Sequence, residues 1–343
     1  MILFCSDYQE GAHPAILEKL NSVNLTQNPG YGTDDICHKA AALIKEKCHC
    51  PGADVHFLVG GTQTNTTVIS AALRPHQGVL CAHTGHISVH ETGAIESTGH
   101  KVLAVQSQDG KITAEQVEKE AILQADFEHT VKPGMVYISF STEVGTLYTL
   151  AELTALRKVC DKHHLYLFLD GARLGYGLCG EGNDVSLQDI ARLCDVFYIG
   201  GTKVGALFGE AVVIVNPALK PDFRYFIKQR GGMLAKGWLL GVQFLTLFEE
   251  DRYFSIAAHA QRLAMAVRDA LRHLHIPFLI DSPTNQQFPI LPDEVLQKLS
   301  DKYAFSFWEK ADETHTAVRI CTSWTTREED VLALIKDLGD AVP

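Results

Sequence analysis

The residues that could carry chemistry in this chain are charged side chains at the ends of apolar segments. In "YLFLDGARL" (residues 166–174), an apolar run that predicts a buried strand ends at Asp170, three residues before Arg173. Lys203 follows a second such run, "VFYIGGTK". A buried carboxylate is costly unless a positive charge meets it, and a desolvated lysine can become nucleophilic toward a carbonyl because its pKa falls. Simpler interpretations stay open: Asp170 and Arg173 pair with each other or cap the next helix, and Lys203 is a solvated surface charge.

A glycine-rich turn, "VGGTQTN" (residues 59–65), leads from a predicted strand into a predicted helix. Free backbone N–H groups and the positive end of the helix favour a phosphate at this turn, and Thr62 could add a hydroxyl donor. Glycine also serves tight connections for conformational reasons alone. The spacing matches neither the dinucleotide-binding fingerprint nor the P-loop.

One phosphate cradle, one carboxylate and one lysine are together what pyridoxal phosphate requires. The lysine forms a Schiff base with the cofactor, the aspartate keeps the pyridine nitrogen protonated, and the helix end holds the phosphate. On this interpretation Asp170 is uncompensated within its strand, because its partner is the pyridinium ring. Arg173 is then free to hold a substrate carboxylate in a bidentate fork.

Strands and helices that would position these residues alternate from about residue 54. Strands are predicted at 54–59, 78–82, 100–105, 134–139, 165–169, 195–200 and 210–215. Helices are predicted between them at 64–73, 88–99, 113–125, 150–164 and 186–193. The alternation predicts an α/β fold with a mostly parallel sheet and helices on both faces. Ligands bind beyond the carboxyl ends of the strands in such sheets, which is where Asp170 stands.

The pattern changes beyond about residue 250. A long amphipathic helix is predicted at 251–275, and short strands and one more helix follow it. A final helix opens at "TTREED", where Thr325 and Glu328 form a capping-box pattern. We therefore predict that residues 1–250 form an N-terminal segment and the large cofactor-binding domain, and that residues 251–343 form a smaller C-terminal α/β domain.

Composition argues against several classes of function. The net charge of −11 and the pI near 5.8 argue against partners such as nucleic acid or an anionic membrane. No apolar run approaches the length of a membrane span, and the first residues are too few for a signal peptide, so we expect a cytoplasmic protein. The nine cysteines are scattered and odd in number, which fits reduced thiols. The "CHC" at residues 48–50 has no second pair at zinc-binding spacing, so no metal is expected.

Several segments of the chain together resemble the threonine aldolases, within the β-eliminating lyase group of the fold-type-I pyridoxal phosphate enzymes. The resemblance runs over nearly the whole chain, through "FCSDYQEGAHP", "NPGYGTDD", "GGTQTN", "HISVHE", "STEVGT", "LDGARL", "GGTK" and "VRICTSW". Each segment is modest alone, but their order and spacing are specific. The resemblance implies the fold-type-I transferase-like fold. It also implies a homo-oligomer, a dimer or a dimer of dimers (a homotetramer), with sites at the subunit interface.

Roles in the cofactor site follow from the resemblance at the matching positions. Lys203 would be the Schiff-base lysine, and Asp170 would be the partner of the pyridinium. His86 would stack on the cofactor ring, and Gly61 and Thr62 would lie at its phosphate.

On the substrate side, the resemblance implies that Ser6, Arg173 and Arg319 bind the carboxylate of the amino acid. Tyr31 would reach the site of the neighbouring subunit. Glu91 would lie near the substrate hydroxyl.

Two segments depart from the family pattern. In "GGMLAKGWLLG" many relatives carry an arginine that contacts the phosphate from the partner subunit. The aligned position here is Trp238, with Lys236 nearby as a candidate point-charge substitute. Gln63 stands where many relatives have methionine, a change that the sequence does not explain.

The implied reaction is retro-aldol cleavage of L-threonine or L-allo-threonine to glycine and acetaldehyde. A base must remove the β-hydroxyl proton while the cofactor ring takes up the electrons of the Cα–Cβ bond. His86, or a water ordered by His86 or Glu91, is the candidate base because an imidazole titrates near neutral pH. One alternative is a β-eliminating lyase that acts on a cysteine- or tryptophan-like substrate. The other is a non-catalytic protein that keeps the fold for oligomerisation or vitamin binding, which the presence of Lys203, Asp170 and both arginines disfavours.

Overall fold

A seven-stranded sheet organises the larger part of the computed structural model, which describes residues 1–123 and 128–342. The strand order is β2–β8–β7–β6–β5–β3–β4. The strands are β2 (Asp54–Leu58), β3 (Gln77–Ala82), β4 (Val102–Val105), β5 (Lys132–Ser139), β6 (Tyr166–Asp170), β7 (Val196–Gly200) and β8 (Glu210–Ile214). Strands β7, β6, β5, β3 and β4 pair in parallel, whereas β8 is antiparallel to both of its neighbours. The predicted mostly parallel sheet is confirmed. Strand β8 is reversed because the link from β7, residues 201–209, is too short for a parallel crossover.

Alternate side chains of the central strands enter two hydrophobic cores, one on each face of the sheet. In β6, Leu167 and Leu169 belong to one core and Phe168 to the other. The first face is covered by α1 (Pro14–Val23), α2 (Asp35–Lys47), α5 (Ala114–Leu123), α6 (Leu150–His163), α7 (Leu174–Leu178), α8 (Leu187–Leu193) and α10 (Trp238–Phe248). The second face is covered by α3 (Gly61–Ala72), α4 (His86–Val89) and α9 (Phe223–Gln229). Helices on both faces explain why these strands are apolar throughout.

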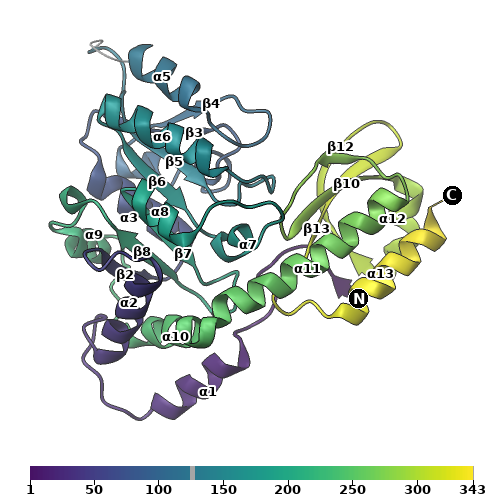
Figure 1. Ribbon diagram of the computed structural model, residues 1–343, viewed down its shortest axis with the longest axis horizontal. Coiled ribbons are helices and arrows are strands. Elements are labelled where there is room, and N and C mark those ends of the chain that lie inside the picture. The colour runs from purple at the N-terminus through teal and green to yellow at the C-terminus, as the bar shows by residue number, and fades with distance from the viewer. Residues whose placement is uncertain (124–127, 343) are drawn as a thin grey trace.

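A long helix, α11 (Arg252–His273), runs from the larger part of the molecule into the smaller one (Figure 1). The smaller part holds a four-stranded antiparallel sheet of order β12–β13–β10–β9. Its elements are β9 (Phe278–Ile280), β10 (Gln286–Pro292), α12 (Asp293–Leu299), β11 (Tyr303–Ala304), β12 (Ser306–Lys310), β13 (His315–Cys321) and α13 (Glu328–Ala341). The first strand, β1 (Ile2–Leu3), pairs in parallel with β11, so the N-terminal residues pack with the C-terminal part of the chain. The division near residue 250 stays a prediction.

Two predicted helices differ from the structure. Residues 88–99 do not form one helix: α4 ends at Val89, and only the 3₁₀ turn η1 (Glu96–Thr98) follows. Thr92 and Gly93 take positive φ values of 53° and 70°, which a right-handed helix cannot accommodate. The last helix begins at Glu328, and the Thr325 hydroxyl bonds to Ser323 instead of capping it. Of the predicted helix 113–125, positions 124–125 lie outside the described residues.

No described helix combines the length and the apolar character that a bilayer crossing requires. All nine cysteines are free thiols. Within residues 1–123 and 128–342, no three His, Cys, Asp or Glu side chains are grouped so that they could hold a metal ion.

Candidate active site

A cavity of about 630 Å³ opens at the carboxyl ends of the parallel strands. Strands β12 and β13 of the smaller part supply one wall, so the cavity lies between the two parts of the molecule. Seven of the sequence-predicted site residues line it: Gly61, Thr62, His86, Asp170, Arg173, Lys203 and Arg319. Ser6, Tyr31 and Glu91 do not.

Lys203 lies in the loop after β7, with its main chain fixed by neighbouring side chains. Its carbonyl oxygen accepts a hydrogen bond of 2.6 Å from the Tyr176 hydroxyl. Burial, and next the positive charge of Arg173, lower the pKa of Lys203 below its ordinary value, although Asp7, Asp170 and Glu210 oppose the shift. An amine with a lowered pKa is available in its neutral, nucleophilic form.

Two carboxyl groups in the cavity wall were not anticipated as site residues. Glu210 accepts hydrogen bonds from Gly201 N (3.2 Å) and Thr202 Oγ1 (2.8 Å) in the lysine loop, and burial raises its pKa to about 8. Glu143 accepts from His86 N (2.9 Å) and Ser139 Oγ (2.6 Å), and burial raises its pKa as well. In the sequence, Glu210 opens an apolar segment, and Glu143 lies in "STEVGT", one of the segments that resemble the family.

The Asp170 carboxylate at the end of β6 is not bare. It accepts hydrogen bonds from Tyr137 Oη, Tyr198 Oη (2.5 Å), Ala172 N (2.9 Å) and Asn65 Nδ2 (3.3 Å). The carboxylate is therefore well hydrogen-bonded within the protein. All these donors are neutral, so the carboxylate still lacks a positive partner in contact with it among the described residues.

The Arg173 guanidinium is not free either. This corrects the expectation that it is free to bind a substrate carboxylate through two hydrogen bonds. Its Nε and Nη2 donate to the two carboxylate oxygens of Asp7 at 2.7 and 3.0 Å, and Asn285 Nδ2 adds a further bond to Asp7 at 3.0 Å. Although burial raises the pKa of Asp7, the charges of Arg173 and Lys203 and these hydrogen bonds lower it to about 2. Only Nη1 of Arg173 is left for a substrate carboxylate within the described structure.

Arg319 on β13 enters the same wall from the smaller part of the molecule. Its Nη1 donates to Gln286 Oε1 (3.2 Å) and its Nη2 to the Cys5 carbonyl (2.9 Å). Its Nε is buried and has no partner among the described residues. Arg319 and Arg173 thus approach the cavity from opposite parts of the chain.

His86 and Glu91 form an ion-pair contact at the edge of the cavity. His86 Nδ1 lies 2.8 Å from Glu91 Oε1, which also accepts from Asn65 Nδ2 at 2.7 Å. Glu91 therefore lies behind His86 and is not part of the cavity wall. It would have to line the wall in order to contact the substrate hydroxyl. Burial lowers the pKa of His86, but its hydrogen bond to Glu91 and the charge of Asp170 outweigh burial and raise the pKa overall. With Nδ1–H donated to the carboxylate, Nε2 is the nitrogen left to face a ligand.

The glycine turn forms a cradle at the start of α3. Gly60 is the N-cap residue, and no side chain caps the helix, so its first backbone N–H groups are open to an anion. Gln63 fixes this turn, because it accepts from Val59 N (3.2 Å) and donates to the Arg230 carbonyl (3.1 Å). This tether explains the glutamine at a position where relatives carry methionine.

The residues of this cavity fit pyridoxal phosphate. The cradle suits its phosphate, Lys203 its aldehyde, and Asp170 its ring nitrogen. Ser141 Oγ, which also lines the cavity, is buried without a partner in the described ranges, as is Arg319 Nε.

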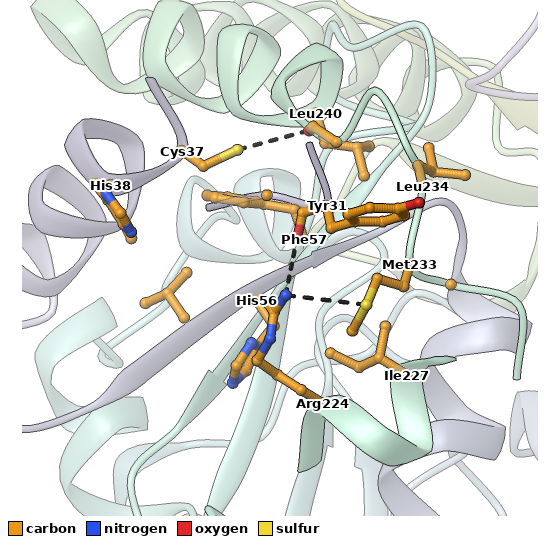
Figure 2. Close-up of a pocket in the computed structure, with 15 residues that line it drawn as sticks. Tyr31, Cys37, His38, His56, Phe57, Arg224, Ile227, Met233, Leu234 and Leu240 are labelled. Carbon is orange, nitrogen blue, oxygen red and sulfur yellow. Dashed lines mark hydrogen bonds between the residues drawn. The ribbon is translucent and has the colours of Figure 1, made fainter. Parts of the chain in front are cut away.

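Tyr31 lies at a different pocket of about 70 Å³, which Figure 2 shows between α2, β2 and α9. The Tyr31 side chain is 48% exposed, and Lys228 Nζ lies 5.1 Å from the centre of its ring. Its main chain is held by Arg224 Nη2 (3.0 Å) and by the Ala235 carbonyl (3.2 Å). Within one chain, Tyr31 is therefore not brought to Lys203.

The remaining predicted positions also lie outside the cavity wall. Ser6 is half-buried beside Asp7. Lys236 is exposed on the segment that contacts Tyr31, whereas Trp238 is buried at the start of α10.

Comparison with known proteins gives matches over the full length of the chain. A low specificity L-threonine aldolase of Pseudomonas sp. (strain NCIMB 10558) is 29% identical over 343 residues, which cover 98% of this chain and 96% of that protein. The solved structure of Leishmania major threonine aldolase superposes with a TM-score of 0.98 at 45% identity, and covers 100% of both chains.

A more distant likeness shows the fold alone. An aspartate aminotransferase of Thermus thermophilus superposes with a TM-score of 0.71 at 15% identity, over 99% of this chain and 91% of that one. The fold is therefore the predicted fold-type-I architecture of pyridoxal phosphate enzymes. The family model for beta-eliminating lyases matches residues 4–292, so this chain belongs to the beta-eliminating lyase family.

Proposed function

We propose that this chain is a pyridoxal phosphate-dependent carbon–carbon lyase that cleaves L-threonine or L-allo-threonine to glycine and acetaldehyde. The observation that carries the proposal is the meeting of Lys203, Asp170 and His86 in one cavity, with Glu91 bonded to His86 from behind. The names of the Pseudomonas and Leishmania relatives support the same reaction.

Pyridoxal phosphate, when bound, supplies an electron sink for the bond that breaks. Lys203 would hold it covalently, Asp170 would pair with its ring nitrogen, and Gly61 and Thr62 would hold its phosphate. His86 would cover the ring.

The chain's own groups would orient the amino acid and move its protons. Arg319 Nε and Arg173 Nη1 are the donors left for the carboxylate. His86 Nε2 would take the β-hydroxyl proton, while Glu91 accepts Nδ1–H and keeps the ring in that tautomer. Ser6 would assist at the carboxylate from its place beside Asp7.

A base directed at the β-hydroxyl favours retro-aldol cleavage over β-elimination. Elimination requires a base at the Cα proton and an acid at the leaving group. The freed Lys203 amine could serve as the base at Cα. The two reactions therefore share Lys203 and Asp170 and differ in their need for His86.

The test is to incubate the purified protein and the cofactor with L-threonine and, separately, with L-allo-threonine. We expect glycine and acetaldehyde in equal amounts, with little 2-oxobutanoate or ammonia. Borohydride should fix a pyridoxyl group on the peptide that contains Lys203, and Lys203→Ala should lose nearly all turnover. Mainly 2-oxobutanoate would favour the β-eliminating alternative, and cofactor binding without any product would favour a non-catalytic protein.

We also infer a homo-oligomer with shared sites, either a dimer or a dimer of dimers. The Tyr31 ring is half-exposed and Lys236 is exposed, and both lie on a surface away from the cavity of their own chain. In an oligomer, Tyr31 of one chain would reach Lys203 of the neighbouring chain. The nine free cysteines support a reducing compartment such as the cytoplasm.

A further inference from the structure

The support of Asp170 comes mainly from two tyrosines on the neighbouring strands. Tyr137 on β5 donates to Oδ2, and Tyr198 on β7 donates to Oδ1 at 2.5 Å. Each carboxylate oxygen therefore receives one phenol. Asp170 is 4% exposed, and both tyrosines are 1% exposed.

The register of the sheet brings the three groups together. Tyr137 pairs with Phe168 across β5 and β6, and Leu169 pairs with Phe197 across β6 and β7. The rings of Tyr137 and Tyr198 both contact the Phe168 ring, with centroids 5.6 and 6.3 Å apart. The two phenols thus flank β6 on one face of the sheet and point to the residue at its end.

The hydroxyls can only act as donors to this carboxylate. Burial, and next the charge of Asp170, raise the pKa of both phenols well above the ordinary value, so both keep their protons. Hydrogen bonds from neutral donors stabilise the ionised carboxylate without neutralising its charge. No cation among the described residues forms an ion pair with Asp170, which leaves its charge for a cationic ligand.

We propose that Tyr137 and Tyr198 are positioning residues that hold the Asp170 carboxylate by one hydrogen bond to each oxygen, so that the proton shared between Asp170 and the cofactor stays on the pyridine nitrogen. This proposal rests on the proposed binding of pyridoxal phosphate. A shared proton resides on the more basic of its two partners. Removing a phenol removes one hydrogen bond that stabilises the negative charge of the carboxylate, so the shared proton moves from the ring toward the carboxylate and the ring withdraws electrons less strongly.

The Tyr198 hydroxyl lies close to Gly61 of the glycine turn. A Cβ at Gly61 would lie 3.1 Å from the Tyr198 hydroxyl, so the phenol lies directly beneath the phosphate cradle. The glycine leaves room for Tyr198 to reach Asp170.

The experiment measures the nitrogen-15 chemical shift of the pyridine nitrogen in holoenzyme loaded with labelled pyridoxal phosphate, because this shift separates a protonated ring from a neutral one. The variants are Tyr137→Phe, Tyr198→Phe and the double variant, which keep the buried rings. Tyr148→Phe is the matched control, since Tyr148 is equally buried and its hydroxyl bonds to Ile112 N, away from Asp170.

We expect the wild type and Tyr148→Phe to show a protonated ring. In each single variant the nitrogen-15 resonance should move toward the position of a neutral ring. The equilibrium of the proton between the ring nitrogen and Asp170 should change about 10-fold per phenol removed, the usual effect of a hydrogen bond to a charged group. The double variant should move furthest, and kcat should fall while KM for the amino acid stays close to the wild-type value. An unmoved resonance in both single variants, or a neutral ring in the wild type, would overturn the proposal. The wild-type threonine assay is independent of this readout, so a failure of the proposed function is detected separately.

Discussion

At the scale of single residues, three of the side chains that would meet a ligand are held by other side chains that would not. Glu91 holds His86, Asp7 holds Arg173, and two tyrosines hold Asp170. Such support fixes the direction and the charge of the group in front, which is how a site is pre-organised for its reaction.

The pairing of His86 with Glu91 leads to a prediction about pH. The Glu91 hydrogen bond raises the pKa of His86, so that Glu91→Gln should lower it. His86 acts as a base only when it is deprotonated, and turnover therefore rises with pH through its pKa. In Glu91→Gln this rise in kcat/KM for threonine should move to lower pH. The maximum rate should fall about 10-fold or more, because the amide holds Nδ1–H less firmly than a carboxylate does.

Glu118→Gln is the matched control for that measurement. Glu118 Oε2 lies 2.8 Å from His163 Nε2, so the variant weakens another histidine–carboxylate pair, on the surface between α5 and α6. We expect a pH profile like that of the wild type. A Glu91→Gln profile with the acidic limb unmoved would show that His86 is not the titrating base.

The ligand-facing residues could be found from the sequence, but most of their supporting partners could not. Lys203, Asp170 and His86 follow predicted strands, and strand ends of a parallel sheet meet at one edge. Asp7 and Asn285 lie far from Arg173 in the sequence, and no local pattern encodes their contact. The same holds for Tyr137 and Tyr198, which looked like ordinary members of apolar strands.

At the scale of elements, the strands of the large sheet agree best with the elements predicted from the sequence. They are buried on both faces, so each is a continuous apolar run. The reversal of β8 and the pairing of β1 with β11 depend on connection length and on long-range contacts. The predicted helix 88–99 is interrupted after Val89, and the positive φ values of Thr92 and Gly93 are not revealed by the helical pattern.

Strands β6 and β7 approach so closely beyond Asp170 that only glycine fits at residue 171. A Cβ there would lie 1.8 Å from the Tyr198 carbonyl oxygen. Gly171→Ala should therefore push β7 away from β6 and lower the free energy of unfolding by about 1–3 kcal/mol or more, the cost of overpacking a core. Because Asp170 and Tyr198 move apart with the strands, turnover should fall as well. Urea denaturation of the apoprotein and the threonine assay measure the two effects.

Gly339→Ala provides the control in the same molecule. Gly339 lies in α13, and a Cβ there would meet nothing within 4 Å. Alanine in a helix interior is favoured over glycine by roughly 0.5–1 kcal/mol, so this variant should be stabilised and fully active. A Gly171→Ala protein as stable as Gly339→Ala would contradict the close approach of β6 and β7.

At the scale of the whole molecule, one buried ion pair connects three regions of the chain. Asp7 belongs to the N-terminal segment, Arg173 follows β6 of the large sheet, and Asn285 precedes β10 of the small sheet. The cavity lies where these regions meet, and its two arginines come from different parts of the molecule. The relative placement of the two parts therefore sets the distance between the donors available for a substrate carboxylate.

A second copy of the chain would complete the site if Tyr31 crosses to a neighbouring cavity. Mixing inactive Lys203→Ala and Tyr31→Ala chains tests this sharing. In a hybrid dimer, one cavity combines the intact Lys203 of one chain with the intact Tyr31 of the other. Random exchange makes half of the dimers hybrid, each with one of two cavities intact, so about a quarter of wild-type activity should return. Lys203→Ala mixed with His86→Asn is the control, because Lys203 and His86 line the same cavity of one chain and no hybrid restores both. Recovery in the first mixture alone is the expected result, and no recovery in a mixture with verified subunit exchange would contradict sharing.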